Sequence, residues 1–474
     1  MIKPDLAVAA NRKKVDITNK ELDLKIEPLF KGQKYFLRTY GCQMNVHDSE
    51  EIKYYLEALG YSPVEELEEA DIVVLNTCAI RENAKDKVFG YLGRCKHLKK
   101  LKPELIIAVA GCLMQKPEEI EEIHNRHQYI DIIIGTHNLS DLPKLIIDAN
   151  NNHNQEIEVY SNSDIVYENV HYNRDSKISA WINIIYGCDK FCTYCIVPFT
   201  RGRERSRKME SVLEEVKNLK EQGYQEITLL GQNVNAYGKD LNLGYDFATL
   251  LEEVAKIGIP RIRFVTSHPW NFTDEMIDVI AKYDNVMPYI HLPIQSGSDE
   301  ILKKMNRKYT IDEYKELFTK IKSKIKNVSV TTDIIVGFPG ETESDFQKTL
   351  DIVNYCQFDG AYTFIFSPRE GTAAAKMVDE TPLSEKEERL QRLNQLVNKY
   401  SLANNQKLLG KTVDVLIVDK SEKDASKVYG YTDTMKLVNI EGGKDLIGKI
   451  IPVEITDAKS FSLDGKVQKE LVVS

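Results

Sequence analysis

Residues 181–208, WINIIYGCDKFCTYCIVPFTRGRERSRK, form the most informative stretch of this chain. An apolar run typical of a β-strand ends at Gly187, and three cysteines follow with C-x3-C-x2-C spacing, at Cys188, Cys192 and Cys195. A structural zinc site normally has four ligands, and an iron–sulfur cluster also normally binds four cysteines. Three thiols on one short loop favour an iron–sulfur cluster that keeps one iron open for another molecule. A zinc loop with a fourth ligand from elsewhere, or cysteines that only pack, are the alternatives.

A dense basic run follows the cysteines. Its five cations are Arg201, Arg203, Arg205, Arg207 and Lys208. The net charge of the chain is −9, which argues against a protein covered with nucleic acid, so any RNA contact must use a local basic patch. This run is the densest candidate, and we predict that it binds RNA phosphates. The alternative is a solvated helix start whose charges pair with Glu204 and Glu210.

The size and composition of the chain indicate a multidomain globular protein. Its 474 residues predict roughly two to four domains. The first thirty residues lack the apolar core of a signal peptide, and the longest apolar stretch, near residues 105–114, is too short to cross a bilayer. We therefore expect a soluble, cytoplasmic protein without a membrane partner. Six of the eight cysteines fall into a pattern that suits metal ligation in a reducing compartment.

Residues 1–33 are predicted to form an N-terminal leader, and residues 34–150 a doubly wound parallel sheet. Three β-rich runs, separated by helix-like sequence, end on Cys42, Cys78 and Cys112. Residues that follow parallel strands meet at one edge of the sheet, where such sheets bind ligands. We therefore predict that these cysteines converge on a second metal centre, the alternative being ordinary burial of cysteine in a core. His137 lies at the same edge and is expected to cap or hydrogen-bond rather than to bind metal.

Residues 151–173 are predicted to be a linker with one short strand, and residues 174–404 a second α/β domain. Six apolar runs separated by amphipathic helices predict a partial (β/α)6 barrel. Its functional face is expected at the carboxyl ends of the strands, on the side of the cysteine loop. The polar or glycine candidates at these ends include Gln232, Asn233, Asn235, Gln295, Ser296, Gly337 and Arg369. Each of them could equally be a strand-to-helix turn residue.

From Lys411 the apolar pattern changes to a period of two, after a charged connector helix that starts near Leu383. Several short strands with Gly and Asp turns predict a small antiparallel β-barrel over residues 405–474. Lys411 and Tyr429 offer a cation and an aromatic ring for phosphates and bases. We therefore predict that this barrel contacts RNA. Cys95 and Cys356, in contrast, sit in helical stretches without a partner at ligand spacing and are expected to pack in the core.

The cysteine spacing, with Tyr194 before the last cysteine, resembles the radical S-adenosylmethionine superfamily. The C-terminal barrel resembles the TRAM domain, and the whole order of modules from residue 34 onward resembles the methylthiotransferases. The sequences TYGCQMNVHDSE (39–50) and YGCDKFCTYCIVPFTRGRERSR (186–207) resemble the branch that acts on transfer RNA. Gln43 and Met44 stand where the branch modifying a ribosomal-protein aspartate has proline-lysine, and where the threonylcarbamoyladenosine branch has lysine-valine.

The resemblance implies two 4Fe-4S clusters, one on Cys188, Cys192 and Cys195 and the other on Cys42, Cys78 and Cys112. The first would cleave S-adenosylmethionine, held by Tyr194 and the strand-end residues, to a radical that removes hydrogen from carbon 2 of N(6)-dimethylallyl(isopentenyl)adenosine next to the anticodon. The second would supply sulfur, and a second S-adenosylmethionine the methyl group. The implied partners are a tRNA anticodon stem-loop, an electron donor such as a flavodoxin or ferredoxin, and a sulfur source.

Three alternatives follow from the same residues. Two are methylthiolation of a ribosomal-protein aspartate and of threonylcarbamoyladenosine in tRNA. The third is a non-catalytic iron–sulfur sensor that binds RNA. The sensor accounts for the cysteines and the basic run, but it gives no reason for six strand ends with polar groups of the size a cofactor needs.

Overall fold

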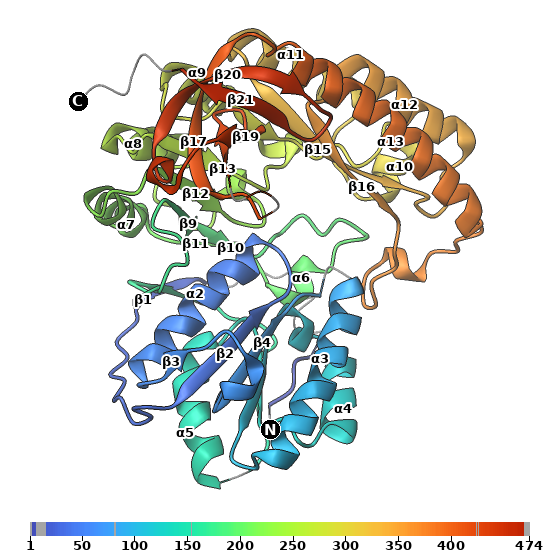
Figure 1. The fold of residues 1–474 in the computed structure, drawn as a ribbon. Coiled ribbons are helices and arrows are strands. Elements are labelled where there is room, and N and C mark those ends of the chain that lie inside the picture. Colours follow the sequence, from blue (N-terminus) through green and yellow to red (C-terminus); the bar gives the residue numbers. More distant parts are fainter. Residues whose placement is uncertain are drawn as a thin grey trace.

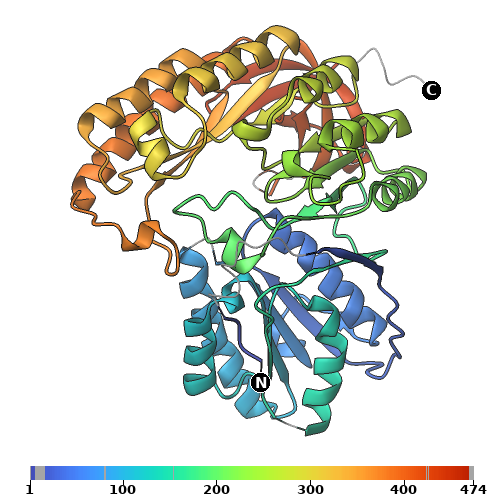
Figure 2. The same cartoon turned by 180° about the vertical axis from the view of Figure 1, so that it is seen from behind.

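The computed structural model describes residues 2–5, 16–79, 82–152, 154–422, 424 and 426–468. Figure 1 shows the N-terminal domain at the bottom, the central barrel above it and the small C-terminal barrel packed on the central one. Figure 2 shows the same arrangement from behind, with the two larger domains meeting along one face. Within the described ranges, the chain has no helix whose length and apolar character would suit a membrane span.

The N-terminal domain is a six-stranded parallel sheet with helices on both faces, as predicted. Its strands, in order across the sheet, are β3 (Ser62–Pro63), β2 (Lys34–Thr39), β4 (Ile72–Thr77), β5 (Ile106–Gly111), β6 (Ile132–Ile134) and β7 (Glu156–Glu158). One face is covered by α2 (Gln43–Ala58) and α5 (Leu142–Asn152), the other by α3 (Glu82–Leu101) and α4 (Pro117–Arg126). Because both faces are covered, every residue of β4 and β5 is buried.

The direction of the chain reverses between β2 and β4. From β2 the chain passes through α2 to β3 at one edge, and from β4 it passes through α3 to β5 on the other side. In open parallel sheets such a reversal opens a crevice at the carboxyl ends of the strands. Cys42 and Cys78 follow the two strands that flank this crevice, so the topology itself brings them together.

Two strands lie in the segment predicted as a linker with one strand. β7 extends the N-terminal sheet, and β8 (Ile165–Glu168) pairs in parallel with β1 (Thr18–Glu21) from the predicted leader. Ile2 bridges to Glu158. These short strands could not be predicted from the polar, Asn-rich sequence, because a strand of three or four residues shows little hydrophobic periodicity.

The central domain is the predicted partial barrel of six strand–helix units. Its parallel strands run β9 (Ser179–Asn183), β12 (Glu226–Leu230) and β13 (Arg261–Phe264), then β14 (Tyr289–His291), β15 (Ser329–Val336) and β16 (Gly360–Ile365), in the spatial order β13-β12-β9 and β14-β15-β16. A bridge between Ile262 and Val286 joins the two halves. The outer helices are α7 (Met209–Glu221), α8 (Phe247–Ile257), α9 (Asp274–Lys282), α10 (Asp299–Lys304), α11 (Ile311–Lys324) and α12 (Glu343–Cys356).

The long helix α13 (Leu383–Gln406) leads to the C-terminal barrel, which is closed. Its strands are β17 (Thr412–Lys420), β18 (Lys427–Thr432), β19 (Leu437–Glu441), β20 (Ile450–Ala458) and β21 (Leu463–Val467). The sequence predicts an antiparallel barrel, and four of its strand pairs are antiparallel, but β19 and β21 pair in parallel. The Arg261 guanidinium fixes this barrel to the central one by donating to the carbonyl oxygens of Tyr431 (2.7 Å) and Asp414 (2.8 Å). Lys436 adds an ion pair of 3.1 Å with Asp359.

Candidate functional site

The loop of the first cysteine triplet is held at the carboxyl end of β9. A short antiparallel pair, β10 (Ile185–Tyr186) with β11 (Arg205–Ser206), closes its base. Gly187 has a φ of +73°, and a Cβ there would lie 2.1 Å from the Arg203 carbonyl oxygen, so this position requires glycine. The Gly187 amide donates to Gln232 Oε1 (2.5 Å) and the Cys188 amide to the Gly202 carbonyl (3.1 Å). The loop is therefore fixed before any cofactor binds.

The three thiols of this loop lie in a low-dielectric pocket. Cys192 is buried, and Cys188 and Cys195 are half-buried. Burial raises the pKa of Cys195 to about 12 and raises that of Cys188 as well. The Arg307 guanidinium contacts the Cys192 sulfur, with Nη1 3.7 Å from Sγ. Buried thiols of this kind become thiolates when a metal compensates their charge.

The second triplet converges at the crevice of the N-terminal sheet. Cys42 occupies the N-cap of α2, and Cys78 follows β4. A hydrogen bond with the Cys78 thiol lowers the pKa of Cys42 to about 6, and the charge of Arg201 contributes. Gly41, with a φ of +137°, permits this approach, because a Cβ there would lie 2.8 Å from Cys78 Cβ. Cys112, at the start of the 3-10 helix η2 (Cys112–Gln115), is buried, which raises its thiol pKa to about 11.

The structure brings the two triplets to one interface. Ile196, next to Cys195, packs in a small apolar cluster with Cys112 and Ala79. The short helix α6 (Val197–Thr200) follows and packs on η2, and Thr136 Oγ1 donates to the Thr200 carbonyl oxygen (2.6 Å). In Figure 1, α6 lies at the junction of the two domains. Cys112 of the second triplet and the residue that follows Cys195 of the first therefore lie at the same contact between the two domains.

The donor sets fit iron–sulfur clusters better than zinc. Throughout the described ranges, no three His, Cys, Asp or Glu side chains are close enough together to hold a single metal ion. A zinc ion needs its ligands within roughly 2.3 Å, whereas a cubane is wider and separates its cysteine ligands. Three cysteines at each site, with arginines rather than further donors beside two of the sulfurs, suit clusters that each keep one open iron.

The predicted strand-end residues differ in whether their polar groups are already engaged within the protein. Asn233 is buried and donates to Glu204 (3.0 Å), while its Oδ1 has no partner among the described residues. The Asn235 side-chain amide donates to the His268 carbonyl oxygen (3.2 Å) and accepts from the His268 backbone amide (2.9 Å). Gln295 has a φ of +71° and bridges to Ile334 of β15 through its backbone. The orphaned oxygen of Asn233 is the feature that best fits a missing polar ligand.

The remaining predicted cofactor residues are less available. Ser296 is fully buried, and its hydroxyl accepts from the Ser298 amide (3.2 Å). Tyr194 packs beside an apolar cluster with Phe338 and Phe366, and Arg369 is half-buried in the loop after β16. The Gly337 amide donates to Glu341 Oε2 (2.7 Å). The backbone N–H of Gly337 is therefore already used, which limits its role to shaping the turn.

Most of the basic run is buried, which does not agree with the phosphate-binding role predicted for it. Arg201 pairs with Asp48, and Arg207 pairs with Glu168 and Glu215. Arg205 is buried too and donates to the Ser163 carbonyl (2.6 Å). Half-buried Arg203 forms a two-point pair with Asp189. Lys208 is the exposed cation of the five.

Sequence reasoning missed three functional candidates. Arg307 reaches Cys192 from a distant part of the chain, and no local pattern marks it. Asp48 follows Cys42 closely on α2 and holds Arg201, which in turn contacts Cys112. Glu341 closes the turn at Gly337 and pairs with Arg389 at 3.0 Å. Its position at the end of the run IIVGFPGE was a signal that could have identified it.

In the C-terminal barrel, Lys411 is exposed and Tyr429 is half-buried. The Tyr429 ring makes an edge contact with Tyr431, with centroids 6.3 Å apart. Both predicted RNA contacts thus lie at the surface of this barrel. Cys95 and Cys356 lie in hydrophobic cores, and burial raises their thiol pKa values to about 11 and about 12.

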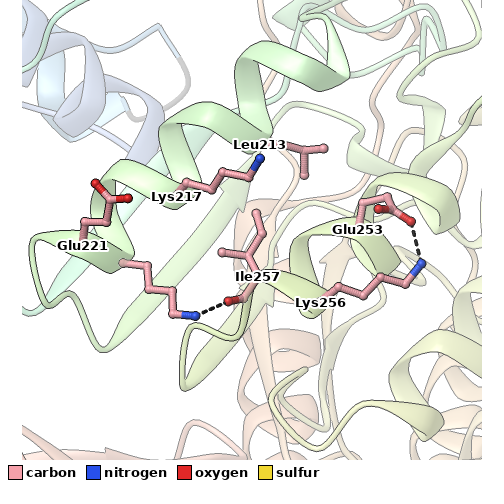
Figure 3. A pocket seen from close by; sticks show the side chains of 7 residues that line it. Leu213, Lys217, Glu221, Glu253, Lys256 and Ile257 are labelled. Carbon is pink, nitrogen blue, oxygen red and sulfur yellow. Dashed lines mark hydrogen bonds and ion pairs between the residues drawn. The ribbon is translucent and has the colours of Figure 1, made fainter.

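A surface groove between α7 and α8 is separate from this site. Figure 3 shows that lysines and glutamates line it, with Lys256 paired to Glu253 and Lys220 bonded to the Ile257 carbonyl. Apart from Leu213, its residues come from the C-terminal halves of both helices, which lie toward the amino ends of the barrel strands. The cysteine loop lies at the opposite ends, so this groove is a solvated helix surface.

Comparisons with known proteins match all three parts of the chain. Family models described as the Radical SAM superfamily, the Uncharacterized protein family UPF0004 and the TRAM domain match residues 182–353, 34–135 and 406–468. Among solved structures, the radical S-adenosylmethionine methyltransferase TsrM from Kitasatospora setae has a TM-score of 0.53 at 14% identity, over 70% of this chain and 73% of that one. The cobalamin-dependent S-adenosylmethionine radical enzyme OxsB has a TM-score of 0.50 at 14% identity, over 78% and 57%. At such identity these two show similarity of fold.

Curated relatives are much closer. A protein of Staphylococcus epidermidis named tRNA-2-methylthio-N(6)-dimethylallyladenosine synthase is 50% identical over 98% of this chain and 92% of its own length. The Bacillus subtilis (strain 168) protein of the same name is 50% identical over 99% of this chain and 93% of its own length. The chain therefore belongs to the tRNA-2-methylthio-N(6)-dimethylallyladenosine synthase family.

Proposed function

We propose that this protein is a radical tRNA methylthiotransferase that inserts a methylthio group at carbon 2 of N(6)-dimethylallyladenosine next to the anticodon. The observation that carries the proposal is the meeting of two separate cysteine triplets at one interface, where Ile196 beside Cys195 contacts Cys112. A hydrogen atom must be removed and sulfur delivered at the same carbon, so the two chemistries need one shared chamber. Relatives named tRNA-2-methylthio-N(6)-dimethylallyladenosine synthase, which match over more than nine-tenths of both chains, support the choice of nucleoside.

Two 4Fe-4S clusters and S-adenosylmethionine are the groups that the donor sets suit. When bound, they would supply the electron that cleaves S-adenosylmethionine to a 5′-deoxyadenosyl radical, the sulfur that is transferred and, from a second S-adenosylmethionine, the methyl group. Carbon 2 of adenine carries a hydrogen that no side-chain base removes at neutral pH, which is why radical chemistry is required. An electron donor such as a flavodoxin or ferredoxin, and a sulfur source, complete the reaction in the cytoplasm.

The residues of this chain would bind and orient the clusters and S-adenosylmethionine and shield them from water. Cys188, Cys192 and Cys195 would hold the first cluster on a loop that glycine and backbone hydrogen bonds keep rigid. Cys42, Cys78 and Cys112 would hold the second, and the hydrogen bond with the Cys78 thiol lowers the pKa of Cys42, which favours the thiolate form that binds metal. The Oδ1 of Asn233, which has no hydrogen-bond partner among the described residues, would accept a hydrogen bond from S-adenosylmethionine.

The tRNA anticodon loop would enter at the domain junction. An adenine in a single-stranded loop can be unstacked and turned into a pocket. Exposed Lys208 and Lys411 offer cations for phosphates, and Tyr429 offers a ring on which a base can stack. Buried Arg201, Arg205 and Arg207 take no part in this contact and instead build the junction.

The test is anaerobic turnover of the reconstituted full chain with S-adenosylmethionine, dithionite and tRNA that carries N(6)-dimethylallyladenosine. We expect about eight iron atoms per chain, 5′-deoxyadenosine, and 2-methylthio product detected by mass spectrometry of nucleosides. A Cys42→Ala variant should retain cleavage of S-adenosylmethionine and lose the product, and a Cys192→Ala variant should lose both. Absence of 5′-deoxyadenosine would leave the sensor, and product on protein but not on tRNA would favour the aspartate reaction.

A further inference from the structure

Each cysteine triplet has one arginine beside one of its sulfurs. Arg307 contacts Cys192 in the first triplet, and Arg201 contacts Cys112 in the second. Arg201 belongs to the central domain, whereas Cys112 belongs to the N-terminal domain. We propose that Arg201 is a positioning residue that raises the reduction potential of the cluster on Cys42, Cys78 and Cys112, so that this potential depends on the docking of the two domains.

The contact is short and well directed. Arg201 Nε lies 3.1 Å from Cys112 Sγ, within the range of a hydrogen bond to sulfur. Its other two nitrogens form a two-point pair with the Asp48 carboxylate, in which Nη1 lies 3.2 Å from Oδ1. Arg201 is 5% exposed, and Asp48 and Cys112 are each 4% exposed. The planar guanidinium can make all three contacts at once, which the ammonium of lysine cannot.

The guanidinium is positioned from both domains. The Arg201 amide donates to the Val197 carbonyl (2.8 Å), so its backbone is fixed by the helix that follows Cys195. Asp48 lies on α2, two turns after Cys42, and holds the head group from the other side. The N–H···S contact therefore exists only when the central domain is seated on the N-terminal sheet. Its functional meaning rests on the two-cluster function proposed above.

The expected electrical effect follows from the charge of the cluster. Reduction makes a cluster more negative, and hydrogen bonds to its sulfurs stabilise that added charge. A guanidinium in a buried, low-dielectric contact adds a favourable Coulomb interaction. Loss of the contact should make the potential more negative. Side chains outside the ligand set commonly tune metal sites in this manner.

The experiment measures potentials rather than turnover. The full chain is reconstituted in two backgrounds: one with Cys188, Cys192 and Cys195 all changed to Ala, which leaves the second site, and one with Cys42, Cys78 and Cys112 changed to Ala, which leaves the first. Dithionite titrations followed by electron paramagnetic resonance give the midpoint potential of the remaining cluster. Arg201→Gln, Arg201→Lys and the double variant Asp48→Asn/Arg201→Gln are compared with Arg307→Gln as the matched control.

We expect Arg201→Gln to shift the second cluster to more negative potential, and Arg201→Lys to shift it less because lysine keeps the charge. The double variant should shift it less than Arg201→Gln, because Asp48→Asn also removes a nearby negative charge. All three should leave the first cluster unchanged. Arg307→Gln should shift the first cluster to more negative potential and leave the second unchanged. The double variant removes both members of the buried pair, so it leaves no unpaired charge to unfold the domain. An unchanged potential of the second cluster in Arg201→Gln, or equal shifts of both clusters, would overturn the proposal.

Iron content settles the case in which a variant does not load. Loss of iron from the second site alone, with the first site full in the intact chain, would support the assignment, since the cluster would then depend on this guanidinium. Loss from both sites to the same extent would overturn it, because that result indicates general unfolding. A wild-type chain with two clusters but no methylthio product would refute the proposed function, while the potentials would still decide the role of Arg201.

Discussion

Arg207 Nη1 donates to Glu215 Oε2 at 2.6 Å in the interior of the domain junction. The same guanidinium contacts Glu168 of β8 at 3.1 Å, and Glu215 on α7 is shared with Arg174. Burial opposes ionisation of Glu215, but Arg207 and Arg174 hold its pKa below the usual value. These side chains join the connecting strand β8 to the outer helix α7 of the barrel, and Arg174 extends the network to Glu50 on α2 of the N-terminal domain at 3.5 Å.

The first prediction is that Arg207→Leu destabilises this junction strongly. It leaves the carboxylates of Glu168 and Glu215 buried without their main partner, which typically costs about 3–5 kcal/mol. The measurement is the midpoint of thermal unfolding together with limited proteolysis of the segment that holds β8. Arg392→Leu is the control, because Arg392 is 36% exposed and pairs with exposed Glu343, and such surface pairs contribute about 0–1 kcal/mol. Equal effects of the two substitutions would contradict the prediction.

The second prediction concerns pH. Burial raises the pKa of Glu51, whose Oε1 accepts from the Tyr55 hydroxyl at 2.7 Å, to about 7 from an ordinary 4.5. A carboxyl with a raised pKa favours folding when protonated, so its contribution is complete below pH 4.5 and is lost as the pH rises to 7. Glu51→Gln should therefore be more stable than the wild type above pH 7, by up to about 2 kcal/mol after discounting for partial exposure.

Denaturant unfolding at pH 5 and pH 8 checks this. The difference in free energy of unfolding between Glu51→Gln and the wild type should be larger at pH 8 than at pH 5, since only the wild type must bury an ionised carboxylate at pH 8. Glu66→Gln, at an exposed position, controls for the loss of one negative charge. A difference that is the same at both pH values would show that Glu51 is ionised in the folded protein throughout this range.

The architecture could be predicted from the sequence because it depends on local repeats. Three strand–helix units that each end on a cysteine require Cys42, Cys78 and Cys112 to lie along one sheet edge, once the strands are parallel. The six units of the barrel and the closed C-terminal barrel follow from the same reasoning about period. Short strands such as β1, β7 and β8 were harder to find, because they pair across long stretches of polar sequence.

The burial of the basic run and its ion pairs could not be predicted, since a charged residue in a sequence does not reveal its partner. Asp48 lies 153 residues before Arg201, and Glu168 lies 39 residues before Arg207. Only the docking of the two domains brings these pairs together and excludes water from them. A dense run of arginines therefore resembles an RNA-binding patch in sequence, although three of them build the junction between domains.

The third prediction is that Gly337→Ala weakens binding of S-adenosylmethionine more than its cost in stability explains. Gly337 has a φ of +67°, which alone costs a non-glycine residue about 1–2 kcal/mol. A Cβ there would also lie 2.5 Å from Lys386 Cγ, and Lys386 is buried and paired with Asp379. Either the buried Lys386 side chain or the turn must therefore shift, which disturbs the packing at the end of β15.

Equilibrium binding of S-adenosylmethionine to the reconstituted chain, with the unfolding midpoint measured in parallel, tests this. Gly223→Ala is the matched control, because Gly223 has a φ of +86° but a Cβ there would meet nothing within 4 Å. It should lower stability by the backbone strain alone, and therefore by less, and leave binding unchanged. Binding that is equally weak in both variants would mean that backbone strain, and not the turn at Gly337, accounts for the loss.

The fourth prediction is that Lys411→Ala reduces tRNA affinity and its dependence on salt. Lys411 is exposed at the start of the C-terminal barrel, so its ammonium can replace counterions on the RNA. Removal of one phosphate contact should lower the slope of log affinity against log salt by about one. Lys459→Ala is the control in the same barrel, because Lys459 already pairs with Asp464 at 2.7 Å and Asp457 at 3.7 Å. Filter binding over a range of salt concentrations should show a smaller change in affinity and slope for Lys459→Ala than for Lys411→Ala. Equal slopes in both variants and the wild type would show that Lys411 does not contact the RNA.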